Sequence, residues 1–429
     1  MKLQRILACV LIWALLSGCA AAPVAADPAK PPSVPQITIP SETAAPTALP
    51  EPEPTEMPPS ETPATQAQTE QPTEPEIEED PVMELLSAMT TDEKIAQLFV
   101  VTPEALTALE GPVDRAGETT RAAFDRLPVG GIIYMGQNLR SADQTRAMLA
   151  DMDQISRERI GLPVFLAVDE EGGTVARISG TGRFDIPAQP DMAELGAAGD
   201  PALAKAQGLT IGTYLKDLGF NLDFAPVADV WTEPGNTVVQ RRSFGSDERV
   251  VSVMALACAE GLQEAGVLPC LKHFPGHGAT LEDSHLDFAV SPRSLDELLS
   301  CELVPFRDGA AAKVPMIMVG HISVPAVTGD ETPASLSPTL VTELLRDTLG
   351  YEGLVITDAL NMGAITAHYT QGEAAVLALL AGCDLLLMPE DPAACAAAIR
   401  QALEEGRLSM ARIDESVERI LRCKLTDLE

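Results

Sequence analysis

The chain has 429 residues, of which 46% are apolar, and a formal net charge of −34 at pH 7. This length and apolar content are ample for a large hydrophobic core. The negative charge argues against nucleic-acid binding, because such proteins draw most of their affinity from lysines and arginines that neutralise phosphates. It also argues against a polybasic patch for anionic lipids. We therefore expect no nucleic-acid partner and a well-hydrated surface.

The N-terminus resembles a bacterial lipoprotein signal. Two basic residues precede an apolar run over residues 6–16, which ends in the tetrapeptide Leu-Ser-Gly-Cys at 16–19. The run is too short to span a bilayer as a mature helix. Small residues directly before a cysteine are typical of lipoprotein processing, so we predict a signal peptide over 1–18 and a lipid on Cys19. The protein would then be exported and anchored to the cell membrane, facing outside the cytoplasm. An ordinary cleaved signal peptide is the alternative.

Residues 19–82 have a different composition from the rest of the chain. Pro, Glu, Thr, Ser and Ala dominate this stretch, and Lys30 is its only basic residue. Few apolar side chains and repeated prolines leave nothing to offset chain entropy, so we predict a disordered, extended tether. The folded domain is expected over 83–429.

The cysteines beyond the signal give no indication of a metal site. No two of them have the C-x-x-C spacing of zinc ligands, and we expect neither a metal nor a cofactor. Buried free thiols are favoured over disulfides, although an exported location permits disulfides. The six residues are Cys258, Cys270, Cys301, Cys383, Cys395 and Cys423.

After the tether, short apolar runs alternate with helical patterns. The runs predict strands at 98–101, 131–135, 164–168, 221–225, 268–271, 316–319, 354–356 and 385–388. Apolar residues at i, i+3 and i+4 predict helices at 201–218, 248–265, 294–306, 338–349, 373–381, 392–405 and 409–423. Eight strands with intervening helices predict an α/β fold, a (β/α)8 TIM-type barrel in one catalytic domain. A doubly wound open sheet is the alternative.

Polar residues follow several of these predicted strands. In a barrel the carboxyl ends of all strands form one face, and active sites are built there. We therefore expect the polar residues at the strand ends to share one mouth. They are Asp169, Lys272, His273, His321 and Asp358.

The densest group of polar residues is KHFPGHG at 272–278, followed by Asp-Ser-His at 283–285. Three of the five histidines in the chain lie between residues 273 and 285. This segment resembles the signature of glycoside hydrolase family 3, in particular its β-N-acetylglucosaminidase branch. Further segments resemble family motifs in the family's order, at 169–173, 242–245 and 357–362, and the resemblance extends from about residue 89 to about residue 424.

The resemblance implies a retaining exo-β-N-acetylglucosaminidase, a glycoside hydrolase of the β-N-acetylhexosaminidase type. Its substrate would be terminal β-linked GlcNAc in peptidoglycan fragments or related glycans. We expect a carbohydrate substrate, a membrane contact only through the lipid, and a monomer. A phosphorylase or β-glucosidase of the same family, and a non-catalytic glycan-binding lipoprotein, remain alternatives.

The resemblance also assigns roles to individual residues. Retaining hydrolysis needs a carboxylate that attacks the anomeric carbon, and the resemblance assigns this role to Asp358. The alternative interpretation of Asp358 is a cap of the following helix. His285 is the implied general acid/base, since an imidazole gives and takes a proton near neutrality. Asp283 would orient the ring of His285. The implied substrate-binding residues are Asp169, Arg177, Arg242, Lys272 and His273.

Two other histidines receive supporting roles. His277 is interpreted as a structural hydrogen-bonding group, and His321 as a residue behind those that contact substrate.

The segment after the 164–168 strand departs from the family's DQEGGRVQR pattern at Glu170, Thr174 and Ala176. Asp169 and Arg177 keep their places, so we expect the subsite for the non-reducing sugar to be retained. Thr174 stands where the family pattern has an arginine. We expect this difference to affect the packing of the loop and the preference for the aglycone.

Overall fold

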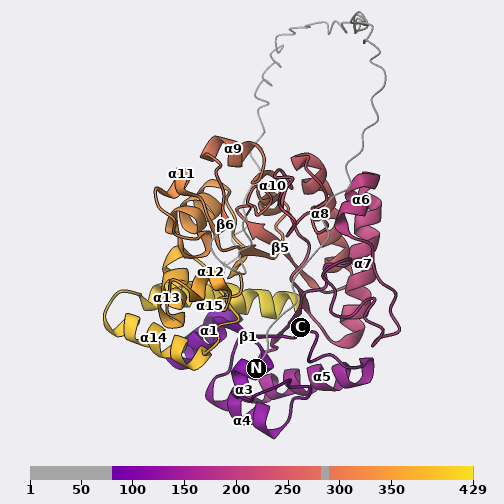
Figure 1. The fold of residues 1–429 in the computed structure, drawn as a ribbon. Helices are drawn as coiled ribbons and strands as arrows, with labels where there is room; N and C mark the ends of the chain where they lie inside the picture. Colours follow the sequence, from indigo (N-terminus) through magenta and orange to yellow (C-terminus); the bar gives the residue numbers. More distant parts are fainter. Residues whose placement is uncertain (1–79, 282–288, 429) are drawn as a thin grey trace, which may run out of the picture. The chain divides into compact units, whose positions relative to one another are not determined.

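A computed structural model describes residues 80–281 and 289–428 (Figure 1). The predicted signal peptide, Cys19, nearly all of the predicted tether, and Asp283 and His285 lie outside the described residues. Within the described ranges, no helix is both long enough and apolar enough to cross a membrane. The first helix, α1 (Pro81–Ala88), begins two residues before the expected domain boundary, with its first turn capped by the Asp80 carboxylate.

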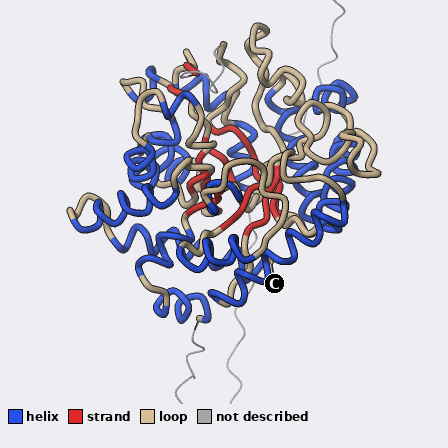
Figure 2. The backbone as a smooth tube through the Cα atoms, turned by 60° about the horizontal axis from the view of Figure 1, so that its bottom comes forward, coloured by secondary structure: helices blue, strands red, loops and turns tan. Residues whose placement is uncertain are grey.

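Eight parallel strands form a closed barrel. Their order is β10-β1-β2-β3-β4-β5-β7-β9, and a bridge between Ile356 and Leu385 links the last strand to the first. Figure 2 shows the strands at the centre with helices around them. The fold is therefore the predicted (β/α)8 barrel and not an open sheet. The strands are β1 (Phe99–Val101), β2 (Gly131–Ile133), β3 (Phe165–Val168), β4 (Leu222–Asp223), β5 (Leu268–Phe274), β7 (Met316–Val319), β9 (Leu354–Thr357) and β10 (Leu386–Leu387).

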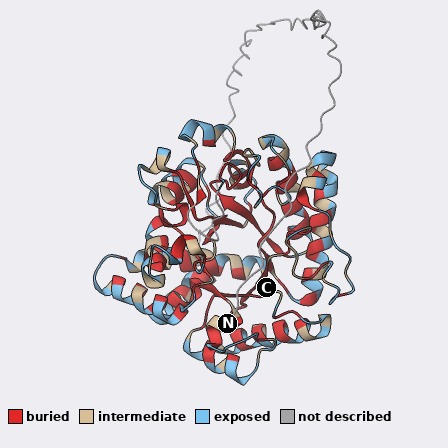
Figure 3. Ribbon diagram, viewed as in Figure 1, coloured by how far each residue is buried: buried red, intermediate tan, exposed pale blue. Residues whose placement is uncertain are grey.

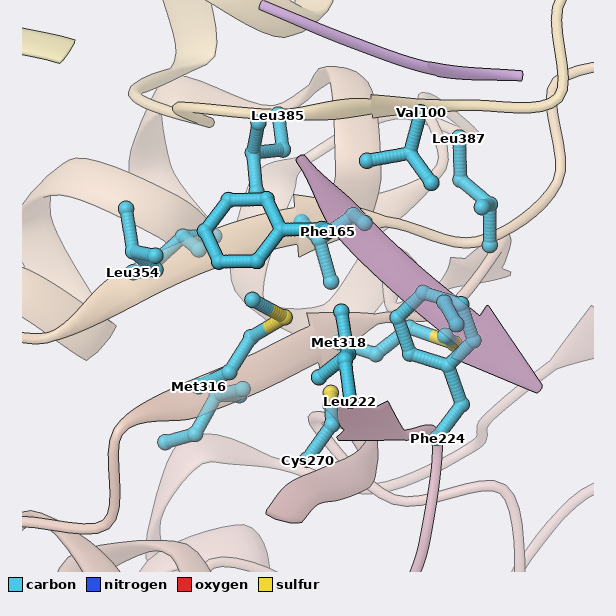
Figure 4. Close-up of a cluster of buried hydrophobic side chains, with 14 of the residues drawn as sticks. Val100, Phe165, Leu222, Phe224, Cys270, Met316, Met318, Leu354, Leu385 and Leu387 are labelled. Atoms are coloured by element: carbon cyan, nitrogen blue, oxygen red, sulfur yellow. The ribbon is translucent and has the colours of Figure 1, made fainter. Parts of the chain in front are cut away.

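All eight predicted strands are confirmed, because each apolar run coincides with one barrel strand. The strands are buried, and Figure 3 shows the buried residues along the barrel and on the inward sides of the helices. Inside the barrel, side chains from different strands fill the space, as Figure 4 shows for Phe165, Leu222 and Met316. Each such side chain stabilises the fold by roughly 1.5–3 kcal/mol through burial.

Helices cover the outside of the barrel. The longest are α5 (Ala142–Ile160), α7 (Pro201–Leu218) and α15 (Met410–Asp427). The others are α2 (Thr91–Gln97), α3 (Pro103–Thr107), α4 (Glu118–Arg126), α6 (Met192–Ala198), α8 (Glu248–Glu264), α9 (Leu295–Ser300), α10 (Val304–Ala311), α11 (Pro325–Thr328), η1 (Ala334–Leu336), η2 (Thr339–Thr348), α12 (Gly363–Thr366), α13 (Gln371–Ala381) and α14 (Pro392–Glu404).

One helix prediction is wrong and one needs refinement. The segment 294–306 is not a single helix, because the chain leaves helical geometry at Cys301 and restarts as α10. Pro305 lies in the first turn of α10, where a residue without a backbone N–H is tolerated. The predicted helix at 338–349 exists as η2, which has π-type hydrogen bonding, for example from Leu349 N to Leu344 O at 2.9 Å.

A second, two-stranded sheet lies beyond the carboxyl end of β7. Its strands β6 (Ala289–Val290) and β8 (Ile322–Ser323) run parallel, and Ser291 N donates to Ser323 O at 2.9 Å. This sheet ties the chain that follows residue 288 to the same face of the barrel as His321.

None of the six cysteines from Cys258 to Cys423 forms a disulfide. Four are buried, as predicted, whereas Cys301 and Cys423 are partly exposed.

Candidate active site

A cavity of about 280 Å³ opens at the carboxyl ends of the barrel strands. The structure brings together in its lining all five residues predicted to bind substrate and the predicted nucleophile. These residues are Asp169, Arg177, Arg242, Lys272, His273 and Asp358. The cavity volume is close to the lower end of the roughly 300–1,000 Å³ range of small-molecule sites, so it suits one sugar ring.

Lys272 lies in β5 and is buried beneath two carboxylates. Its Nζ is 3.0 Å from Asp169 Oδ1 and 2.7 Å from Glu171 Oε1. Burial alone would lower the pKa of Lys272, but Asp169 and Glu171 raise it above the ordinary value. The lysine is therefore a fixed positive charge at the floor of the cavity.

Glu171 connects Lys272 to Arg242. Arg242 Nε lies 2.8 Å from Glu171 Oε2, and a second guanidinium nitrogen lies 2.7 Å from Oε1, which makes the pair bidentate. Burial would raise the pKa of Glu171, but Arg242 and Lys272 hold it well below its usual range. Sequence reasoning missed Glu171 as a site residue. The available signal was its position two residues after Asp169, because alternate residues of an extended segment face the same side.

Arg177 contacts Asp169 only loosely, with 3.8 Å between Nη2 and Oδ2. Its Nε is buried and has no hydrogen-bond partner among the described residues. A buried donor without a partner costs about 1–3 kcal/mol. The guanidinium group of Arg177, which lines the cavity, thus keeps hydrogen-bonding capacity that no described residue uses.

The loop that carries Arg177 is held by Glu170. The carboxylate accepts hydrogen bonds from the backbone N–H groups of Arg177 (2.6 Å), Ile178 (2.9 Å) and Ser179 (2.8 Å) and from the hydroxyl of Tyr214 (2.8 Å). Four donors need two accepting oxygens, which a carboxylate offers and a glutamine does not. The departure from the family pattern at Glu170 therefore has a structural account.

Thr174, which stands in place of an arginine, also has a defined contact. Its backbone N and its hydroxyl donate to Asp191 Oδ1 at 2.9 and 2.8 Å. Asp191 Oδ2 in turn accepts from Arg241 Nε at 2.7 Å. The loop is thus anchored at both ends, by Glu170 and by Asp191.

His273 is oriented by a second residue that sequence reasoning missed, Asp229. His273 Nδ1 lies 2.8 Å from Asp229 Oδ2, and Nε2 lies 3.4 Å from a guanidinium nitrogen of Arg242. Asp229 also accepts from the backbone N–H groups of His273 (3.1 Å) and His277 (2.7 Å). Burial raises the pKa of Asp229, but His273, His277 and these hydrogen bonds bring it below its usual value. Since Asp229 is ionised, Nδ1 is the donor and Nε2 faces the cavity side.

His277 lies in the lining but is tied to its own loop. Its Nδ1 is 2.8 Å from Thr280 Oγ1, and burial lowers its pKa. Asn236 Nδ2 donates to its carbonyl at 2.8 Å. These contacts agree with the predicted structural role.

Asp358 directly follows β9 and extends the barrel ladder, because its backbone N donates to Val319 O at 2.8 Å. Burial would raise the pKa of Asp358, but His273, His321, the N–H of Ala359 and Lys272 hold it below its usual value. The carboxylate is therefore ionised at neutral pH. It does not cap a helix, since the next helix, α12, begins five residues later with Met362 at its cap.

His321 lies behind Asp358 and is absent from the cavity lining. Its Nδ1 is 2.8 Å from Ser335 Oγ, and its Nε2 is 3.0 Å from the carbonyl oxygen of Ala359. This contact fixes the segment that carries Asp358, which agrees with the predicted supporting role.

Asp283 and His285 lie outside the described residues, so their predicted roles stay predictions. Across residues 80–281 and 289–428, no three His, Cys, Asp or Glu side chains are grouped as ligands of a metal ion.

An eight-stranded barrel that gathers an ionised aspartate with arginine and lysine donors at the carboxyl ends of its strands places the chain in the class of TIM barrels that carry a polar site at this face. The chain belongs to one family of this class. Residues 90–423 match the family model described as the glycosyl hydrolase family 3 N terminal domain.

Similar proteins come from several bacteria. The β-hexosaminidase LpqI of Mycobacterium tuberculosis is 41% identical over 275 residues, which cover 61% of this chain and 68% of that protein. β-Hexosaminidase A of Pseudoalteromonas piscicida is 34% identical over 329 residues, covering 70% of this chain and 54% of that protein. The structure of a family 3 β-N-acetylglucosaminidase from Paenibacillus sp. str. FPU-7 superimposes with a TM-score of 0.72 and 38% identity, covering 79% of this chain and 62% of that one. The chain thus spans about half of the Pseudoalteromonas protein and less than two thirds of the Paenibacillus chain.

Proposed function

We propose that this protein is a retaining exo-β-N-acetylglucosaminidase that removes terminal β-linked GlcNAc from peptidoglycan fragments or related glycans. The relatives that are named hexosaminidases and N-acetylglucosaminidases support the reaction and the sugar. The observation that carries the proposal is Asp358, an ionised carboxylate in a cavity that suits one sugar ring.

Asp358 is proposed as the nucleophile. Among the described hydrogen bonds, only its Oδ1 has a partner, the N–H of Ala359 at 2.8 Å, which leaves Oδ2 for attack on the anomeric carbon. The bond from the anomeric carbon to the leaving oxygen breaks while the bond to Asp358 forms, and water later displaces the aspartate with net retention.

His285 is proposed as the group that protonates the leaving oxygen and then removes a proton from the attacking water, with Asp283 orienting its ring. Both assignments rest on the sequence motif alone, since neither residue is described.

The remaining cavity residues are proposed to hold the sugar. Lys272 and the guanidinium groups of Arg177 and Arg242 are donors for hydroxyl oxygens, and Asp169 is an acceptor. Buried polar groups of this kind discriminate strongly between sugars, because a substrate that lacks the matching hydroxyl leaves them without partners.

We also propose that the protein is exported, carries lipid on Cys19 and acts as a monomer at the cell surface. The sequence of residues 1–19 supports the anchor. Exchange of Cys19 for alanine should move the protein from the membrane fraction to the soluble fraction with unchanged specific activity. Equal membrane association of both forms would reject the anchor.

A panel of chromogenic substrates tests the proposed activity. The protein without its first 79 residues is incubated with nitrophenyl β-GlcNAc, β-GalNAc, β-glucoside and β-xyloside, with Asp358→Asn as the inactive control. The proposal expects cleavage of the β-GlcNAc substrate above all others. Preference for the β-glucoside would indicate the β-glucosidase alternative. Saturable GlcNAc binding without any turnover would indicate a glycan-binding protein.

A further inference from the structure

A second cavity, of about 300 Å³, adjoins the first on the same face of the barrel. Asn361 and Met388 line both cavities. The rest of its lining comes from Thr102, Glu104 and Ala105, which follow β1, and from Pro389 and Glu390, which follow β10. Asn361 lies only three residues after Asp358, so the second cavity begins next to the reacting carboxylate.

The lining of this second cavity is acidic. It contains the side chains of Glu104 and Glu390 and no lysine, arginine or histidine. Neither glutamate forms an ion pair with any described residue. Glu104 Oε1 accepts from Val113 N (2.8 Å) and Asn138 Nδ2 (2.7 Å).

The two carboxylates differ in exposure. Glu104 Oε2 is buried and has no hydrogen-bond partner in the described part of the chain. Glu390 is exposed at the rim. The lining of the cavity therefore carries two carboxylates that no cation of the described residues neutralises, and of the two only Glu390 is exposed.

We propose that this cavity is the subsite for the leaving part of the substrate, and that it selects a neutral or cationic amino sugar over an anionic one. The inference rests on the proposed function. A glycoside whose terminal sugar fills the first cavity must project its aglycone out of it, and the second cavity is the adjoining space on the same face. Hydroxyl or ammonium donors of an amino sugar match the exposed carboxylate of Glu390, whereas a carboxylate on the aglycone is repelled by the charges of both glutamates. The second cavity thus selects oligosaccharides of N-acetylated or free amino sugars over fragments that carry muramic acid.

The test compares two disaccharides in which GlcNAc is β-1,4-linked to glucosamine or to muramic acid. The quantity measured is the ratio of kcat/KM for the two substrates at low salt. Wild type should prefer the glucosamine substrate. Glu390→Gln and Glu104→Gln should each shift the ratio about three- to fivefold toward the muramic acid substrate, because each removes one nearby charge. Glu390→Lys should shift it further. All these shifts should shrink at high salt, where charges are screened.

The matched control is Glu352→Gln, which removes an exposed carboxylate just before β9, at the opposite end of the barrel. It should leave the ratio unchanged. Thermal melting shows whether Glu104→Gln still folds. If it does not fold, the two Glu390 variants still carry the test, because Glu390 is exposed. An unchanged ratio in Glu390→Gln and Glu390→Lys, with both disaccharides cleaved, overturns the subsite but not the proposed function. No cleavage of either disaccharide or of nitrophenyl β-GlcNAc by wild type overturns both.

Discussion

The carboxylate of Asp229 lies 2.8 Å from Nδ1 of His273 and fixes the orientation of that ring at the mouth of the barrel. The two residues are 44 positions apart in the chain, and Asp229 also holds the backbone of the loop that contains His277. A single buried carboxylate thus orients a side chain predicted to contact substrate and shapes the adjoining turn.

Exchange of Asp229 for asparagine should lower kcat/KM for nitrophenyl β-GlcNAc by about 10- to 100-fold. Asparagine loses the negative charge, and a charge-assisted hydrogen bond is worth about 1.5–3 kcal/mol. The pH profile of kcat/KM should also change, because the tautomer of His273 is no longer fixed. Asp347→Asn, at an exposed position on η2, is the control. A loss of activity that only follows a lower melting temperature, with an unchanged pH profile, would assign Asp229 a purely structural role.

Exchange of Glu170 for glutamine should raise KM by about three- to tenfold and affect kcat less. One oxygen of the glutamine would no longer be available to the loop N–H groups, so Arg177 would be held less firmly, at a cost of about 1 kcal/mol. Steady-state kinetics measure the separate changes in KM and kcat. A fall in kcat at constant KM would show that the loop acts on the chemical step instead.

Much of the fold could be predicted because parallel strands that are buried on both faces read as continuous apolar runs. The helix α5 was not predicted, although Met148, Leu149, Met152 and Ile155 have helical spacing, because charged residues interrupt the run. The break at Cys301 was also missed, because the apolar periodicity continues across it and only Pro305 hints at a restart.

The site could be predicted where its residues follow a strand directly. Asp169 and Asp358 have this position, Lys272 and His273 lie in the last residues of β5, which is longer than predicted, and the structure places all four in one cavity. Asp229 could not be found in this way, because it lies in a loop after β4 and its importance comes from a contact with a distant part of the chain.

Lys424 gives a prediction about stability and pH. Its Nζ is buried, lies 2.8 Å from Gln97 Oε1 and sits 5.1 Å from the centre of the Phe165 ring. Burial lowers the pKa of Lys424 to about 7, whereas an unfolded chain has a lysine pKa of about 10.4. The unfolded state therefore binds the proton more tightly, so the free energy of unfolding should fall as the pH drops from about 10 to about 7 and level off below that.

Exchange of Lys424 for methionine should remove this pH dependence, because a similar volume is filled without a titrating group. Urea unfolding at pH 6, 7, 8 and 9 measures the effect. A destabilisation of the same size at every pH would contradict the assignment.

Exchange of His285 for alanine should slow GlcNAc conjugates with poor leaving groups severely and spare activated nitrophenyl substrates, which leave with little help from a proton. A series of leaving groups, assayed with and without phosphate and with products resolved, measures this. Equal slowing of all leaving groups would reject the acid role. A glycosyl phosphate product would favour the phosphorylase alternative.

Asp358 is expected to form a covalent bond to the sugar during the reaction. The most direct measurement is to trap the intermediate with a fluorinated GlcNAc-type glycosyl donor and to locate the label by peptide mass mapping. We expect one glycosyl group on the peptide that contains Asp358 in wild type and none in a folded Asp358→Asn variant. A label on any other residue, or full turnover by Asp358→Asn, would contradict it.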